Sequence, residues 1–394
     1  MKPTIYLDNG ATTRVCEEAL EVYLNVSRAH FGNPSSLHAV GFDAEGVLKN
    51  ARAEVMKALG AKDGTLVFTA SGSEANNLAI FGRAHAKERY RGKKILTTAG
   101  EHSSVSAVAA ALKNEGYKYE TIPTAGGALD FDTLEKMLTP DVVLISAMIV
   151  NNETGALYDL ARLSRMMKEK CPDAVLHADA TQAFMKIPFT PAALGADMVT
   201  ISSHKIEGPK GVGALYVSAQ IIKTRGLSPL ILGGGQEAGY RSGTENVPGI
   251  AAFAKAAIIA KNDLQNRIKK ISDLRSYLLE KLEGDDRLSD ISALCPPEFS
   301  PHIVSLTVPN IKSETMLHFL SSEGICVSSG SACSSNAQVR HTSEALLAYG
   351  QTEQDADSSI RISFSHRNTR EDVDALCEAL ALGLSRLARI RRAK

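Results

Sequence analysis

Short apolar runs of strand length recur through the first two thirds of this 394-residue chain, separated by segments of helical character. The runs are mostly apolar along their length, so both faces of each strand are expected to be buried. Such a series predicts an α/β fold in which a mostly parallel sheet carries helices on both faces. The runs are 65–69, 94–98, 142–146, 174–177, 198–201 and 213–217.

The pattern changes near residue 249. A long helical pattern covers 250–282, strand-like runs follow at 303–308 and 359–364, and a closing helix starts near residue 370. This order indicates a smaller α+β domain after the sheet domain, in line with the two or three domains that the length suggests. We expect an N-terminal segment 1–14 that packs with the small domain, a large domain over 15–250 and a small domain over 251–394.

The composition excludes several classes of protein. Lys+Arg and Asp+Glu each number 44, so no overall field favours nucleic acid or a membrane surface. There is no apolar stretch long enough to span a bilayer, and residues 1–8 lack a signal-peptide core, which predicts a cytoplasmic protein. Six cysteines without a C-x-x-C pair indicate reduced thiols and neither a zinc site nor a disulfide framework.

A lysine and an aspartate each follow a predicted strand. Lys205 comes just after the run 198–201 and before a Gly/Pro segment, a position that can direct its amine into a cleft, and Asp179 follows the run before it. Ligands of parallel sheets bind at the carboxyl ends of the strands, so both side chains are expected at one site. A Schiff-base lysine and an aspartate facing a ring nitrogen are what pyridoxal 5'-phosphate (PLP) requires.

Each of these residues has an alternative interpretation. Lysines before Gly-Pro turns are usually solvated, and Lys210, between Pro209 and Gly211, is expected to point outward in this way. An aspartate at the end of a strand commonly caps the next helix. The case for a PLP site therefore depends on whether other segments supply the remaining parts.

A small-residue segment, 69–77, follows a strand and opens a helix. Backbone N–H groups near Gly72 and the Ser73 hydroxyl could bind a phosphate there, aided by the helix dipole, and Ser202 and His204 could add hydrogen bonds. A plain strand-to-helix turn is the alternative. His102, also after a strand, could stack on a planar cofactor and move protons, although a lone histidine is more often structural.

Three further segments could complete such a site. Amides of the segment 150–155, which includes Asn152, could bind a phenolic oxygen, with an Asn/Gly turn as the alternative. The polar segments 233–237 and 241–246, which include Thr244, could reach a phosphate in a neighbouring subunit. Arg361 is the one charge in an apolar run, so it needs an anionic partner, either a substrate carboxylate or an internal salt bridge.

The segment 328–336 consists almost wholly of small polar residues and one thiol, Cys333. It has too little apolar area to be buried, so we expect a mobile surface loop. An exposed free cysteine is prone to oxidation, which favours a functional thiol over an inert one.

The order of these motifs resembles that of the cysteine desulfurases, PLP enzymes of the aminotransferase class V group. The likeness covers nearly the whole chain, and the Ser-Gly-Ser-Ala-Cys stretch ending at Cys333 is similar to the group that serves iron–sulfur assembly and tRNA thiolation. A selenocysteine-lyase-like signature is absent from this region. The matching segments are 6–13, 32–38, 101–102, 151–153, 179–182, 203–205, 241–244 and 329–333.

The resemblance implies a fold type I PLP-dependent transferase and a role for each matching residue. Lys205 would carry PLP, Asp179 would pair with the pyridine nitrogen, and His102 would stack on the ring. Gln182 and Asn152 would address the phenolic oxygen, while Gly72, Ser73, Ser202 and His204, with Thr244 from the second subunit of a homodimer, would hold the phosphate. Arg361 and Asn33 would bind the carboxylate of L-cysteine, and Cys333 would receive its sulfur.

The implied activity converts L-cysteine to L-alanine and leaves a persulfide on Cys333 for an acceptor such as an iron–sulfur scaffold or a tRNA thiolase. No resident metal is implied, although Cys333 could be a transient iron–sulfur ligand. Another PLP reaction, selenocysteine lysis or transamination, stays open, as does a catalytically silent sulfur carrier. Gly10, Glu207 and the segment 363–367 depart from the expected pattern, which leaves local electrostatics and partner choice undecided.

Overall fold

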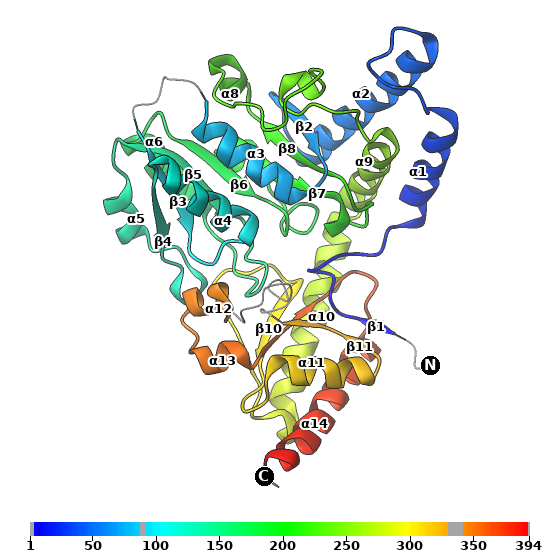
Figure 1. Ribbon diagram of the computed structural model, residues 1–394. Coiled ribbons are helices and arrows are strands. Elements are labelled where there is room, and N and C mark those ends of the chain that lie inside the picture. Colours follow the sequence, from blue (N-terminus) through cyan, green and yellow to red (C-terminus); the bar gives the residue numbers. More distant parts are fainter. Residues whose placement is uncertain (1–3, 87–91, 330–341, 393–394) are drawn as a thin grey trace.

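The computed structural model describes residues 4–86, 92–329 and 342–392 (Figure 1). A seven-stranded sheet forms the large domain, in the order β2-β8-β7-β6-β5-β3-β4. All neighbouring strands run parallel except β8, which is antiparallel to both β2 and β7. The strands are β2 (Thr65–Thr69), β3 (Lys94–Thr98), β4 (Lys118–Ile122), β5 (Val142–Met148), β6 (Val175–Asp179), β7 (Met198–Ser202) and β8 (Gly213–Val217). The predicted α/β fold with a mostly parallel sheet is confirmed.

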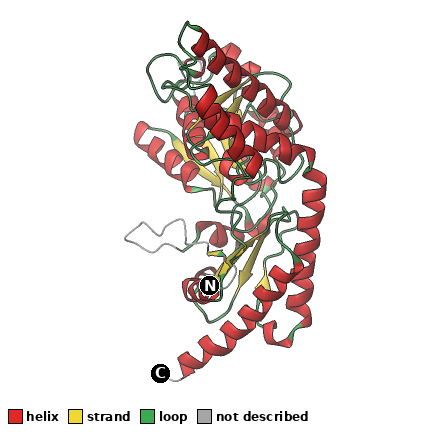
Figure 2. Cartoon of the chain, turned by 90° about the vertical axis from the view of Figure 1, so that its right-hand side faces the viewer, coloured by secondary structure: helices red, strands yellow, loops and turns green. Residues whose placement is uncertain are grey.

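Helices cover both faces of this sheet, and Figure 2 shows the strands enclosed between them. Alternate residues along a strand enter different cores: Leu144 packs with α3 and α4, whereas Ile145 packs with the helices of the opposite face. The helices of the large domain are α1 (Glu17–Ala29), α2 (Ala39–Leu59), α3 (Gly72–Ala84), α4 (Ser103–Leu112), α5 (Phe131–Met137), α6 (Leu160–Lys170), α7 (Pro191–Leu194), α8 (Ala219–Thr224) and α9 (Val247–Asn262).

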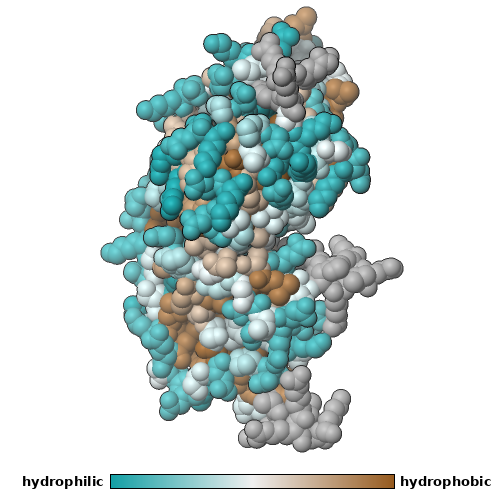
Figure 3. Space-filling view, turned by 90° about the vertical axis from the view of Figure 1, so that its left-hand side faces the viewer, coloured by the Kyte–Doolittle hydropathy of each residue, from teal (hydrophilic) through white to brown (hydrophobic). Residues whose placement is uncertain are grey.

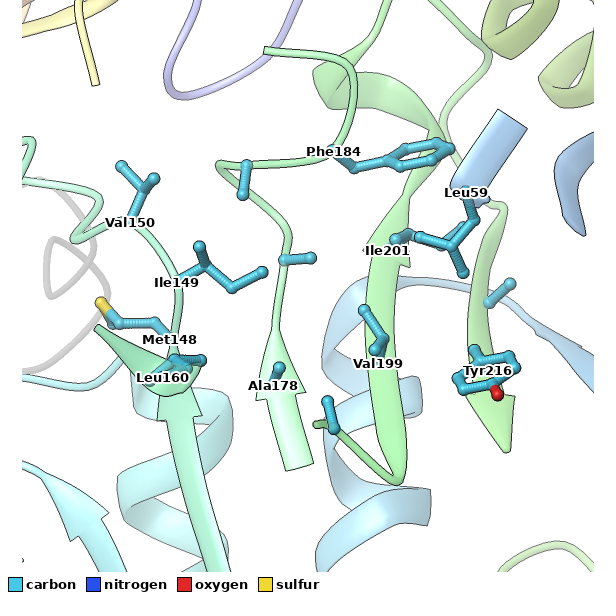
Figure 4. Packing of buried hydrophobic residues seen from close by; sticks show 14 of the residues in the cluster. Leu59, Met148, Ile149, Val150, Leu160, Ala178, Phe184, Val199, Ile201 and Tyr216 are labelled. Atoms are coloured by element: carbon cyan, nitrogen blue, oxygen red, sulfur yellow. The ribbon is translucent and has the colours of Figure 1, made fainter. Parts of the chain in front are cut away.

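The core directly below the strand ends is close-packed. Phe184, in the turn after β6, lies beside Leu59 and Ile201 (Figure 4). Its ring meets Phe253 of α9 edge to face, with 6.3 Å between the ring centroids. These contacts give the segment 179–187, which carries several site residues, a rigid support.

The small domain has a four-stranded antiparallel sheet in the order β12-β13-β10-β9. The N-terminal strand β1 (Ile5–Tyr6) pairs in parallel with β11 (Ile325–Cys326) of this domain, and Asp8 forms an isolated β-bridge with Ser363. Residues from both ends of the chain thus meet at this domain. Its other elements are β9 (Ser292–Ala293), β10 (Ile303–Thr307), β12 (Ser328–Ser329), β13 (Ser359–Ser363), α10 (Leu264–Gly284), α11 (Ser313–Ser322), α12 (Glu344–Tyr349), α13 (Glu353–Asp357) and α14 (Arg370–Arg392).

The single helix expected over 250–282 is two helices, α9 and α10, which meet at Asp263. Asp263 has φ −109° and ψ 8°, and its carboxylate accepts hydrogen bonds from Asn266 and Arg267 at 2.9 and 3.3 Å. Aspartate favours such local contacts over a continuous helix. The break separates the cores as well, because buried residues of α9 as far as Ala260 belong to the large domain and those of α10 to the small domain.

On the side of the molecule shown in Figure 3, the surface is mainly hydrophilic in the upper part, and hydrophobic residues gather mostly in the lower half. Within the described ranges, no helix combines the length and apolar character needed to cross a bilayer.

Candidate active site

A cavity of about 410 Å³ lies at the carboxyl ends of β5, β6 and β7, where the N-terminus of α3, the segment 8–11 and strand β13 of the small domain also meet. This is the sheet edge at which the sequence predicted a site. Ten predicted site residues line it: Gly72, Ser73, His102, Asn152, Asp179, Gln182, Ser202, His204, Lys205 and Arg361.

Two predicted residues within the described ranges do not line this cavity. Asn33 and Thr244 are exposed, and the Asn33 side chain accepts a hydrogen bond from the Ser35 amide at 2.9 Å. Cys333, with its loop, lies outside the described residues.

The Lys205 side chain enters the cavity from a 3-10 turn, Ser203–Lys205, that begins where β7 ends. Its Nζ donates to the carbonyl oxygens of Gly10 and Ala11 at 2.6 and 2.8 Å. The turn is held to the N-terminal segment because the amide of Thr13 donates to the His204 carbonyl at 2.9 Å. Lys210, in contrast, is exposed, as expected from its Pro and Gly neighbours.

Asp179, at the end of β6, has both carboxylate oxygens engaged. Oδ1 accepts from the Thr181 amide and Oδ2 from Asn76 Nδ2, each at 2.8 Å. Asn76 Nδ2 also donates to Ser104 Oγ at 2.8 Å, so Asn76 links Asp179 to the start of α4. Asn76 was not predicted from the sequence as a site residue; its place one helical turn after Gly72, on the cavity side of α3, was the available signal.

His102 caps α4 and lines the same side of the cavity. Its Nδ1 accepts from the Ser104 amide at 3.1 Å, so in the neutral ring the proton belongs on Nε2. Burial lowers the pKa of His102, and Lys205 lowers it further, although Asp179 acts in the opposite direction. His102 is therefore a neutral ring with a single N–H donor at neutral pH.

The N-terminus of α3 and the end of β7 form the anion-binding side. The Ser71 hydroxyl accepts from the Glu74 amide and begins the helix. A Cβ at Gly72 would stand 3.2 Å from Thr181 Oγ1, so a side chain would crowd this side of the cavity. Ser202 Oγ is buried without a hydrogen-bond partner among the described residues. An unpaired hydroxyl beside a helix N-terminus fits a phosphate group.

Arg361, on β13, is almost fully buried at the opposite wall. Its Nη2 lies 2.8 Å from Asp8 Oδ1 and its Nη1 donates to the Asn152 carbonyl at 2.8 Å. Nε is buried and has no partner within the described part of the chain. The internal salt bridge considered from the sequence is thus present, and the guanidinium also faces the cavity.

Glu207, one of the departures noted from the sequence, is buried behind Lys205 with φ +67°. Its carboxylate contacts Arg367 at 2.6 Å, Arg267 at 3.0 Å and His366 at 3.8 Å. These residues join the Lys205 turn to α10 and to the segment before α14. Glu207 is thus buried within the chain, where its charge acts on these three side chains.

The described residues contain no group of three or more His, Cys, Asp or Glu side chains that could hold a metal ion. The site is thus built from a lysine, a carboxylate, a neutral imidazole, an anion-binding helix terminus and a buried guanidinium. A family model described as aminotransferase class-V matches residues 5–376. The chain belongs to this family.

Two curated relatives match over nearly the whole chain. Cysteine desulfurase IscS 1 of Archaeoglobus fulgidus is 36% identical over 383 residues, which cover 97% of this chain and 97% of that protein. Cysteine desulfurase IscS of Dictyoglomus turgidum is 36% identical over 392 residues, covering 99% and 97%. These relatives place the class-V chain among the cysteine desulfurases and confirm the resemblance in its motifs.

Solved structures of class-V relatives have the same architecture. A NifS-like protein matches with a TM-score of 0.88 and 35% identity, covering 97% of this chain and 99% of that one. A structure described as SspA in complex with cysteine matches with a TM-score of 0.78 and 30% identity, covering 92% and 99%. The PLP-dependent transferase fold is confirmed, and enzymes of this family use PLP.

Proposed function

We propose that this chain is a PLP-dependent cysteine desulfurase that converts L-cysteine to L-alanine and receives the sulfur atom on Cys333 as a persulfide. One observation carries the proposal: Lys205, Asp179 and Arg361 converge on one cavity in a chain that belongs to the class-V family. Relatives named cysteine desulfurase support the substrate, as does the description of one similar structure as a complex with cysteine.

The residues of the cavity fit PLP. Lys205 would hold it covalently, Asp179 would face the pyridine nitrogen and His102 the ring. Gln182 and Asn152 would address the phenolic oxygen, and the unpaired Ser202 hydroxyl supports phosphate binding together with Gly72, Ser73 and His204. When bound, PLP supplies an electron sink for the charge that develops at the substrate α-carbon.

Arg361 would bind the substrate carboxylate, helped by Asn33, and fix the α-carbon near Lys205. The Lys205 amine, now held by two carbonyl oxygens, would take the α-proton as general base. Asp179, fixed by Asn76 and Thr181, would keep its carboxylate on the ring nitrogen. A neutral His102 with its proton on Nε2 could donate at the ring face.

Sulfur transfer would be the work of Cys333. Its thiolate attacks the substrate sulfur, an S–S bond forms and the substrate C–S bond breaks. The electron pair of the broken bond stays with the substrate carbon, which is protonated to give alanine. The persulfide then passes to an acceptor protein, either an iron–sulfur scaffold or a tRNA thiolase.

We infer that the working unit is a cytoplasmic homodimer. Thr244 is exposed and outside its own chain's cavity, as a residue contributed to a second subunit would be. Two large apolar side chains are exposed as well, Leu37 to 89% and Leu232 to 80%, which is typical of an interface. We further propose a division of each subunit into 1–14, a PLP-binding domain and a domain that carries the Cys333 loop, with the boundary expected near residue 250 moved to Asp263, where the two cores separate.

The test is incubation of the purified protein with PLP and L-cysteine. We expect alanine and a persulfide on Cys333 in equal amounts. A keto acid product without persulfide would support an aminotransferase, and activity confined to selenocysteine would support a lyase.

A further inference from the structure

The Gln182 side chain has a fixed orientation at the edge of the cavity. Its Nε2 donates to the Gly10 carbonyl at 2.8 Å, and because a carbonyl oxygen only accepts, the amide nitrogen must face it. Its Oε1 points the other way, 3.2 Å from Lys186 Nζ and 3.3 Å from His302 Nε2. Three contacts from three different segments therefore agree on one orientation of this amide.

His302 acts as a donor in this arrangement. It is buried, with Nδ1 2.7 Å from Ser300 Oγ. Burial lowers the pKa of His302 well below its ordinary value, and Lys186 adds to the effect. Gln182 Oε1 can only accept, so Nε2 carries the proton of the neutral ring and Nδ1 accepts from the Ser300 hydroxyl.

Lys186 is the second donor, and its surroundings are crowded with positive charge. Burial lowers its pKa, followed by the charges of Lys205 and Arg361. A small cavity of about 40 Å³ lies behind Lys205, and the titratable groups that line it are Lys186, Lys205, Glu207, Arg267, His302 and His366. Even a neutral Lys186 amine keeps its N–H donors, so the contact to Gln182 Oε1 does not require a charge.

The consequence concerns the second N–H of Gln182. The amide nitrogen has two protons, one used by Gly10 and one left for the cavity that Gln182 lines. A phenolate oxygen accepts hydrogen bonds, so it is stabilised by this N–H and repelled by a carbonyl oxygen turned toward it. The orientation of one amide thus decides between a favourable and an unfavourable contact.

We propose that Lys186 and His302 are positioning residues that hold the Gln182 amide so that its N–H, and not its oxygen, faces the phenolic oxygen of bound PLP. This rests on the proposed function, because it assigns a role toward the cofactor of that site. Neither residue touches the substrate in this scheme; both act through Gln182.

The test is a pH titration of the visible absorption of the PLP-loaded protein, without cysteine. Replacing Lys186 by Met removes one of the two donors to Gln182 Oε1 and so weakens the preference of the amide for its orientation. In the molecules in which the amide turns, the phenolic oxygen loses its donor, holds more negative charge and stabilises the protonated form of the adjacent nitrogen that links Lys205 to PLP. We expect the midpoint of the titration to rise by about 0.5 to 1 pH unit, the size of one lost hydrogen bond.

Matched variants separate this role from a structural one. Lys186→Arg keeps a donor and is expected to restore the wild-type midpoint, and Lys223→Met removes a charge from an exposed site on α8 and is expected to leave it unchanged. Gln182→Glu cannot donate in its charged form, so adding Lys186→Met to it is expected to shift the midpoint little further. Should Lys186→Met fail to fold, His302→Leu removes the other donor.

The outcomes are distinct. The positioning role is overturned if the midpoint of the absorption titration is the same in wild type and Lys186→Met. It is also overturned if the midpoint shifts of Lys186→Met and Gln182→Glu add fully in the double variant. Wild-type protein that gains no visible absorption with PLP overturns the proposed function itself.

Discussion

Asp8 and Arg361 form an ion pair across the candidate active site, with 2.8 Å between Asp8 Oδ1 and Arg361 Nη2. The Arg361 side chain is 8% exposed and that of Asp8 19%, so water screens the pair little. A substrate carboxylate that binds Arg361 therefore meets a guanidinium whose charge is already partly balanced by Asp8. Asp8 therefore competes for the same guanidinium from within the chain.

Asp8→Asn removes the competing charge. We expect the KM for L-cysteine to fall about fivefold, the effect of roughly 1 kcal/mol, with little change in kcat. Steady-state kinetics provide the measurement, with Asp132→Asn, on the exposed surface of α5, as the matched control. A KM that rises instead would show that Asp8 orients Arg361 for the substrate.

Asn76→Ala removes the side chain that links Asp179 to Ser104. The Asp179 carboxylate loses a donor, so we expect PLP to bind about tenfold more weakly or worse. Titration of the protein with PLP measures the Kd, and Asn114→Ala at an exposed site is the control. An unchanged Kd would mean that Asn76 only fills space between α3 and α4.

Glu207→Gln breaks a buried ion cluster. Arg267 and Arg367 would lose their charged partner, so we expect the free energy of unfolding to fall by about 2–4 kcal/mol in denaturant melts. Glu135→Gln, which breaks an exposed pair with Lys170, is expected to behave as wild type. Equal effects from both substitutions would count against a special role of the cluster.

Glu101 gives a pH dependence of stability. Its Oε1 accepts from the Met148 amide at 2.7 Å and from Thr98, while Oε2 is buried without a described partner. Burial raises the pKa of Glu101 to about 8. The protonated form is the stable one in the fold, so its contribution is complete below the unfolded pKa near 4.5 and is lost as pH rises through about 8.

We therefore expect the wild-type Tm to decline between about pH 5 and 8 more steeply than that of Glu101→Gln, whose neutral amide keeps the acceptor. Thermal melts across this range test it. Parallel profiles for the two proteins would mean that Glu101 is ionised in the fold.

The sequence predicted the sheet well because its central strands are buried on both faces and read as apolar runs. It did not show β4, an edge strand whose Lys118 and Glu120 face solvent. Nor did it show that β8 runs antiparallel, since strand direction depends on the path of the chain between strands. Asp263 interrupts the helix that was expected over 250–282. An aspartate is a possible helix end, but the apolar helical pattern on both sides of it favoured one continuous helix.

For the site, the sequence pattern predicted the residues that directly follow strands, because parallel strands bring their carboxyl ends to one edge of the sheet. Residues that act through another side chain were missed. Asp8 reaches Arg361 across 353 positions of sequence, and Lys186 and His302 meet at Gln182 from different segments. The contacts of Asp8 with Arg361 and of His302 with Gln182 depend on how distant parts of the chain pack, and that of Lys186 with Gln182 on the turn after β6; a sequence pattern encodes neither.

The most direct measurement follows labelled sulfur from L-cysteine in a single turnover of the PLP-loaded protein, with mass analysis of the peptide that contains Cys333. The account predicts one labelled sulfur atom on Cys333 for each alanine formed, none in Lys205→Ala or Cys333→Ser, and wild-type transfer in Lys210→Ala. Labelled sulfur on another residue, or full transfer in Lys205→Ala, would contradict it.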